Sequence, residues 1–177
     1  SIINLANVND APALQAGADD TAAEGTRFNH AITLGDPDPD THLITVDWGD
    51  GSAPTQYSTS EAVFNIWHYF PDDGSYTVTV TANDQAGQGN SVETDSFQVV
   101  VSNVAPDLWL SGNATVEQNQ AYTLTLGSVY DPGDDTVTEY RIDWGDGSPL
   151  QVIAAGDLPA NRELVHTYTS TGDRTIS

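Results

Sequence analysis

Oxygen-bearing side chains gather in the loops of this chain, where they could bind a hard cation. Such a cation takes about six to eight oxygen ligands, many of them carboxylates on flexible loops. The candidate ligands in the first half of the chain are Asn9, Asp10, Asp36, Asp38 and Asp84. Those in the second half are Asn103, Asp131 and Asp134. Calcium is therefore the expected cofactor, and the alternative is that the Asp-Pro sequences are only rigid, soluble turns.

Aromatic side chains form a second kind of candidate site. Trp67 and Tyr69 alternate with Ile66 and His68, so they lie on the opposite face of a predicted strand. Trp109 follows the start of the second half of the chain. If exposed, these three rings are candidate contacts for a glycan or a protein ligand, whereas packing between sheets or modules is the alternative explanation.

Catalytic chemistry has little support in the sequence. Cysteine is absent, which excludes thiol catalysis and thiolate metal sites, and no Gly-x-Ser-x-Gly, His-Glu-x-x-His or phosphate-binding glycine loop occurs. His68 and His166 occupy matched positions in two predicted strands, which favours hydrogen-bonded core histidines. His42 borders the acidic loop and is expected to be solvated. The chain is therefore predicted not to be an enzyme.

The charge of the chain restricts its partners. The net charge is −22 and there is no lysine. Such a chain repels phosphate backbones and anionic lipids, so nucleic acid is not expected as a partner. No stretch approaches the roughly 20 apolar residues of a membrane helix, so membrane insertion is not expected either.

The element that organises these residues is a repeated sextet. Asp-Trp-Gly-Asp-Gly-Ser occurs at residues 47–52 and again, letter for letter, at residues 143–148. Ile44, Val46 and Trp48 alternate with polar residues before the first turn, as in a half-buried strand. Glycine and aspartate then favour a chain reversal. The repeat predicts two copies of one domain, with Trp48 and Trp144 at equivalent inward positions.

The boundaries of the two copies follow from a recurring linker. Asn-Val-Asn-Asp-Ala-Pro ends at residue 12, and Asn-Val-Ala-Pro recurs at residues 103–106. Residues 1–8 are interpreted as the tail of a preceding module, residues 9–102 as the first domain and residues 103–177 as the second. In the alignment of the copies Ser177 falls opposite Thr79, so the second domain is expected to be incomplete at its C-terminal end. An edge left open in this way invites a complementing chain or a neighbouring module of the same polypeptide.

The strand pattern predicts the fold class. About seven short alternating segments per copy, separated by turns, indicate an all-β fold made of two tandem immunoglobulin-like antiparallel β-sandwiches. In such a sandwich the starting linker, the loop after the second strand and the turn after the sixth strand converge at one end. The predicted ligands of the first copy occupy those three places.

Four spaced motifs resemble those of the polycystic kidney disease (PKD) domain. They are Trp-Gly-Asp-Gly-Ser, His-Tyr-Phe at residues 68–70, Gly-x-Tyr-x-Val-x-Val at residues 74–80 and Asp-x-x-Gly at residues 84–87. The resemblance implies tandem immunoglobulin-like modules of secreted or surface proteins, and some such modules bind calcium at the places named above. Arg174 departs from the pattern by replacing the tyrosine after Gly172, which puts a charge at a position expected to face inward.

The function predicted from these observations is that of a non-catalytic, extracellular spacer module in a bacterial cell-surface, adhesin-like protein, stabilised by calcium. The alternative is an accessory module of a secreted hydrolase that binds polysaccharide or protein.

Overall fold

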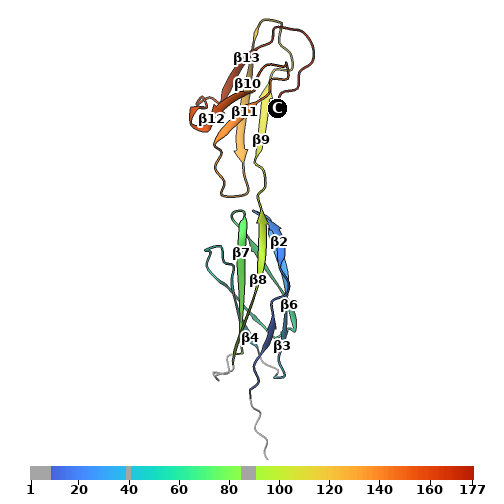
Figure 1. Cartoon of the computed structure of the whole chain (residues 1–177), viewed down its shortest axis with the longest axis vertical. Coiled ribbons are helices and arrows are strands. Elements are labelled where there is room, and N and C mark those ends of the chain that lie inside the picture. The colour runs from blue at the N-terminus through green and yellow to red at the C-terminus, as the bar shows by residue number, and fades with distance from the viewer. Residues whose placement is uncertain (1–8, 39–40, 85–90) are drawn as a thin grey trace, which may run out of the picture. The chain divides into compact units, whose positions relative to one another are not determined.

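A computed structural model describes residues 9–38, 41–84 and 91–177 and divides the chain into two compact units, Ser1–Val104 and Ala105–Ser177. Both units consist of β-strands joined by turns (Figure 1). The predicted tail at residues 1–8 and most of the predicted Asp-x-x-Gly turn lie outside the described residues. Within the described ranges no helix has the length and apolar character needed to cross a bilayer.

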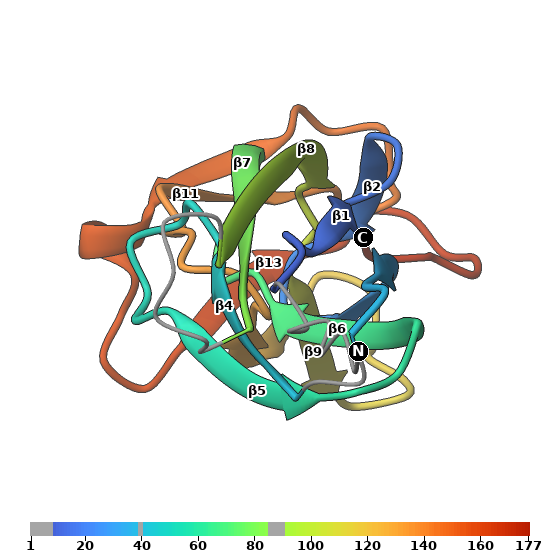
Figure 2. The same ribbon diagram turned by 90° about the horizontal axis from the view of Figure 1, so that it is seen from below.

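The first unit is a sandwich of two sheets. One sheet has the strand order β1-β3-β6 and the other the order β2-β8-β7-β4-β5. Viewed from below in Figure 2, β5, β4, β7 and β8 follow one another across one layer. The bounds are β1 Ala13–Gln15, β2 Asp20–Ala23, β3 Arg27–Gly35, β4 His42–Asp47, β5 Thr55–Thr59, β6 Val63–Tyr69, β7 Gly74–Asn83 and β8 Val92–Ser102.

The pairing is antiparallel, as predicted, except between β2 and β8. These two strands run parallel, with Asp20 opposite Val99. The exception arises because the first strand of the sandwich is split. Its first part, β1, pairs with β3, and after a turn at Gly17 (φ 94°) its second part, β2, joins the other sheet beside β8. A single strand thus contributes to both layers.

The core of the first unit lies between its two sheets. Alternate residues of the strands point inward, so that β4 buries Ile44 and Val46 while Thr45 lies at the outer face. Trp48 is fully buried, which confirms its predicted inward position. The other buried hydrophobic residues of this core are Leu14, Ala16, Phe28, Ile32, Leu34, Phe64, Ile66, Phe70, Val78, Val80, Ala82, Phe97, Val99 and Val101.

The second unit has a smaller set of strands and a smaller core. One sheet has the order β13-β10-β9 and the other consists of β11 and β12. The bounds are β9 Asp107–Gly112, β10 Ala121–Tyr130, β11 Glu139–Ile142, β12 Gln151–Ala154 and β13 Glu163–Thr167, with one 3-10 turn, η1, at Ala155–Asp157. Trp144 is 2% exposed, as predicted. It packs with Leu124, Leu126, Ile142, Leu164 and Tyr168.

The sextet forms the same turn in both units. Gly49 has a φ of 73° and Gly145 a φ of 70°, a left-handed conformation that favours glycine. A Cβ atom on Gly49 would also lie 2.5 Å from the carbonyl oxygen of Thr77. The preceding aspartate closes each turn, since Asp47 Oδ1 accepts a hydrogen bond from Gly49 N and Asp143 Oδ1 one from Gly145 N. Both conformation and space therefore require glycine at this position.

Candidate functional site

The five ligands predicted in the first unit come together from three segments of the chain. Asn9 and Asp10 precede β1, Asp36 and Asp38 follow β3, and Asp84 follows β7. Asn9 Nδ2 donates to Asp84 Oδ2 over 2.7 Å, and Asp10 N donates to Asp38 Oδ2 over 2.9 Å. Asp38 N in turn donates to Asp36 Oδ1 over 2.8 Å. The structure therefore places these residues in one hydrogen-bonded group at one end of the sandwich.

His42 belongs to this group, and its predicted solvation is wrong. Its side chain is 3% exposed and its Nε2 lies 2.8 Å from Asp36 Oδ2. The reason is the alternation of β4, whose first residue, His42, points inward together with Ile44 and Val46. The imidazole thus holds Asp36, which is itself 5% exposed, in a fixed orientation.

Calcium stays a prediction for this group, because in the described residues no three of its carboxylates bring their oxygens within 4.8 Å of one another. Asp36, Asp38 and Asp84 offer carboxylate oxygens, and each of these oxygens has two lone pairs, so a hydrogen bond does not exhaust it. In the structure the amide nitrogen of Asn9 faces Asp84. Rotating the amide by 180° would bring its oxygen, Oδ1, to the same position. Asp36, Asp38 and His42 also border a cavity of about 480 Å³.

The ligands predicted for the second copy fall into two units. Asn103 follows β8 and belongs to the first compact unit. Asp131 and Asp134 lie in the loop after β10 of the second unit, where Asp131 Oδ1 accepts a hydrogen bond from Gly133 N over 3.1 Å. This set stays a prediction.

The predicted aromatic contacts are exposed. Trp67 is 45% and Tyr69 51% exposed on the outer face of β6, with their rings edge to face at 6.1 Å. The guanidinium carbon of Arg27 lies 5.0 Å from the centre of the Trp67 ring. Trp109, in β9 of the second unit, is 78% exposed. Trp67 and Tyr69 therefore form one small surface of the first unit, defined with Arg27.

The sextet contributes a buried group that the sequence interpretation missed. Asp50 Oδ2 lies 2.6 Å from His68 Nε2, and the His68 ring stacks on Trp48 at 4.4 Å. The second unit repeats this Trp–His–Asp motif. Asp146 Oδ2 lies 2.8 Å from His166 Nε2, and the His166 ring stacks on Trp144 at 4.6 Å. The recurrence of the second aspartate of the sextet together with a matched histidine was the signal that could have revealed it.

The environment of each motif favours the ionised carboxylate. Burial raises the pKa of Asp50, but hydrogen bonds from Ser52 and His68 outweigh burial, so its pKa lies below the usual value. Hydrogen bonds from Ser148 and His166 lower the pKa of Asp146 in the same way. Each motif therefore ties the sextet turn to the neighbouring strand, β6 or β13, through a charge-assisted hydrogen bond. Both histidines are thus hydrogen-bonded, as predicted, and lie half-buried at the edge of the core.

Comparisons with known proteins find several similar chains. The sequence is 29% identical to human polycystin-1 over 139 residues, which covers 78% of this chain but 3% of polycystin-1. Among solved structures, the PKD domain of an M14-like peptidase from a Thermoplasmatales archaeon is 22% identical, with a TM-score of 0.42, over 53% of this chain and 98% of its own. Fibronectin(III)-like modules of Clostridium thermocellum CbhA are 17% identical, with a TM-score of 0.33, over 88% of this chain and 78% of their own.

The family match is more specific than these likenesses. The sequence profile of the PKD domain family matches residues 9–99, which include the first sextet and the first Trp–His–Asp motif. PKD domains are generally non-catalytic modules, and no catalytic family is indicated. The chain belongs to the PKD domain family.

Proposed function

We propose that this chain is a non-catalytic, extracellular spacer module of a bacterial cell-surface, adhesin-like protein, and that calcium stabilises its first unit. The observation that carries the proposal is the group formed by Asn9, Asp10, Asp36, Asp38 and Asp84. A cation bound there would join the chain segment before β1 to the ends of β3 and β7. It would thereby stiffen the entry to the sandwich, as a spacer requires.

The charge of the group also supports calcium. Four aspartates lie at one end of the sandwich, and like charges that lie close together repel one another. A divalent cation removes this repulsion and binds only the folded unit, because the ligands come from distant parts of the sequence. Binding to the folded state alone raises the free energy of unfolding.

Thermal unfolding of the full chain in calcium and in EDTA tests this proposal. Extracellular calcium modules have dissociation constants of about 10⁻⁴–10⁻³ M. At about a hundredfold excess over that constant the gain is about 2.7 kcal/mol, which corresponds to a rise in melting temperature of roughly 10–20 °C for a domain of this size.

Two variants make the test specific. Asp38→Asn should reduce the calcium-dependent rise, because it replaces a charged carboxylate by a neutral amide that keeps only one oxygen. Asp157→Asn, an equal change of charge at an exposed position in η1, should leave the rise intact. Equal melting temperatures of the wild-type first unit in calcium and in EDTA would overturn the proposal.

A second candidate function is that of an accessory module that binds a polysaccharide or protein. The surface formed by Trp67, Tyr69 and Arg27 favours it, because exposed aromatic rings can stack on a sugar or a partner side chain. Pull-down of the full chain with insoluble cellulose and chitin tests the polysaccharide form. Binding that is lost in Trp67→Ala and retained in Trp109→Ala would replace the spacer proposal by this one.

A further inference from the structure

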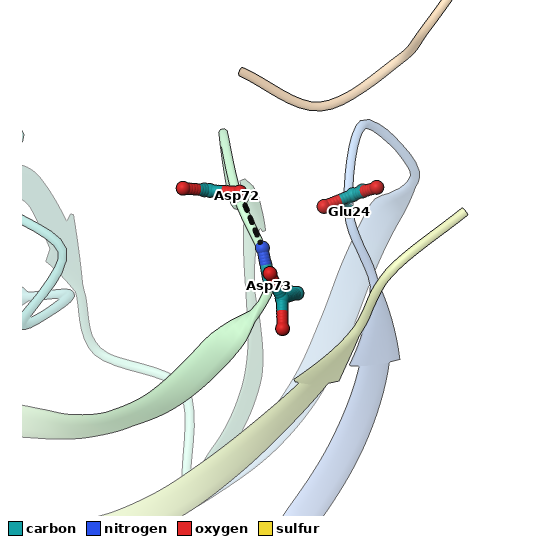
Figure 3. A group of neighbouring side chains, drawn as sticks. All are labelled: Glu24, Asp72 and Asp73. Carbon is teal, nitrogen blue, oxygen red and sulfur yellow. Dashed lines mark hydrogen bonds between the residues drawn. The ribbon is translucent and has the colours of Figure 1, made fainter. Parts of the chain in front are cut away.

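A second acidic group lies at the other end of the first unit. Glu24 precedes β3, and Asp72 and Asp73 form the turn between β6 and β7. One carboxylate oxygen from each of the three lies within 4.8 Å of those of the other two. Figure 3 shows the Glu24 carboxylate opposite the turn that carries the two aspartates. β3 has nine residues, so this group is about 30 Å from the one at Asp36.

Glu24 is held in place by its surroundings. Its backbone N–H donates to the carbonyl of Ser102 at the end of β8, and its Oε1 accepts a hydrogen bond of 2.7 Å from Val104 N. The next residue, Gly25, donates its N–H to the carbonyl of Phe70, which joins the Glu24 loop to the loop of Asp72 and Asp73. The three carboxylates thus belong to two connected loops.

Among the described residues, the second oxygen of Glu24 lacks a hydrogen-bond partner. The residue is fully buried, and its Oε2 is a buried atom without a hydrogen bond in the described part of the chain. Within that same part, no arginine or histidine forms an ion pair with Glu24, Asp72 or Asp73. A buried carboxylate without a compensating charge is costly unless it binds a cation or a proton. The free oxygen therefore points to a ligand.

The ring of Tyr76 lies beside this group. Its hydroxyl donates to the backbone carbonyls of Asp72 and Asp73, over 2.9 and 3.2 Å. The Tyr76 side chain therefore contacts the turn that carries two of the three carboxylates.

We propose that Glu24, Asp72 and Asp73 form a second calcium site, which holds the Glu24 loop against the turn between β6 and β7. The ligands are all oxygens, the preference of a hard cation, and Asp73 is solvent-exposed, so water can complete the coordination. An exposed, irregular loop suits calcium better than magnesium, which demands a near-ideal octahedron. This site does not depend on the proposed function or on the group at Asp36.

Terbium luminescence on the full chain tests the proposal, because terbium replaces calcium and is excited by a nearby tyrosine. Glu24→Gln and Asp73→Asn should each weaken the terbium signal that calcium displaces, with an affinity loss of about tenfold, since ligand charge sets the affinity of such sites. Asp73 is exposed, so Asp73→Asn keeps the test valid if Glu24→Gln fails to fold. Tyr76→Phe should lower the emission while calcium affinity by calorimetry stays unchanged.

Controls separate this site from the one at Asp36. Asp38→Asn should remove a different calcium-binding event, and Glu117→Gln, an exposed change of equal charge in the second unit, should remove none. Unchanged terbium affinity in both Glu24→Gln and Asp73→Asn would overturn the proposal, as would equal affinity for magnesium and calcium.

Discussion

The two units share a motif but differ in the sheet around it. In the first, the sextet strand β4 lies between β7 and β5 in a five-stranded sheet. In the second, the corresponding strand β11 forms a two-stranded sheet with β12. The tryptophan, histidine and aspartate nevertheless adopt the same arrangement, with the histidine ring stacked on the indole at 6° in one unit and 9° in the other.

This difference teaches that the motif depends on few neighbours. The motif needs a strand that leads into the sextet and a strand that carries the histidine, and both units have these. The first aspartate of the sextet also has an equivalent strand partner in each unit. Asp47 pairs with Thr79 in the first, and Asp143 exchanges two backbone hydrogen bonds with Ser177 in the second. The motif is therefore a local unit of structure, and the wider sheet adds core around it.

The largest expected effect comes from removing the indole. Trp48→Ala should lower the free energy of unfolding of the first unit by about 3–5 kcal/mol, because it leaves a large cavity in a closed core. Trp144→Ala should lower the free energy of unfolding of the second unit by less, because the smaller core of that unit can relax into the cavity more easily. Hydrogen–deuterium exchange with mass spectrometry on the full chain reports each unit separately. Equal losses of unfolding free energy in the two units would show that core size does not determine the effect of removing the indole.

The next effect concerns the carboxylate of the motif. Asp50→Asn removes a charge-assisted hydrogen bond from a side chain that is 1% exposed, so a loss of about 1–3 kcal/mol is expected. Asp146 is 14% exposed, and Asp146→Asn should destabilise its unit less. Asp47→Asn, an exposed change of equal charge in the same sextet, serves as the control in urea unfolding. A larger loss of unfolding free energy at Asp146 than at Asp50 would contradict the expectation that the more buried carboxylate contributes more.

A pH series sharpens the same comparison. The pKa of Asp50 is lowered in the folded unit, whereas the unfolded value is about 3.9. The folded state therefore binds fewer protons, so this stabilisation is complete above the unfolded pKa and is lost as the pH falls towards the folded pKa. The gap in unfolding free energy between wild type and Asp50→Asn should narrow from about pH 5 to pH 3. A constant gap would show that ionisation of Asp50 does not contribute.

The smallest effect is expected where Arg174 replaces tyrosine. Tyr76 in the first unit donates its hydroxyl to turn carbonyls, and Arg174 donates to Asp173 O and Ser170 Oγ in the second. Arg174 Nε is buried without a hydrogen bond in the described structure. Arg174→Tyr should thus stabilise the second unit by about 1 kcal/mol or less. Tyr76→Phe should destabilise the first by a similar amount, and both are measurable by thermal unfolding.

The sequence predicted the fold class and the meeting of three loops for good physical reasons, whereas the role of their residues as calcium ligands stays a prediction. Alternation along residues 44–48 and the repeated sextet indicated strands and two related domains, and the inward places of Trp48 and Trp144 are confirmed. The meeting of Asn9, Asp36 and Asp84 followed from the convergence of three loops in such a sandwich. The structure shows how the charge of Arg174 is accommodated. Its long side chain turns back and donates hydrogen bonds to Ser170 Oγ and Thr171 O of its own turn.

Other features required the tertiary structure. Alternation gives the face of a strand on which a residue lies, but not the partner it meets across the sandwich, so the contacts of His42 with Asp36 and of His68 with Asp50 were not predicted. Glu24 stands before a glycine in a turn, where a solvated side chain is the usual outcome. Its hydrogen bonds instead join it to Ser102 and Val104, some 80 positions away. Local patterns determine strands and turns, whereas burial of a charged group is decided only when distant segments pack around it.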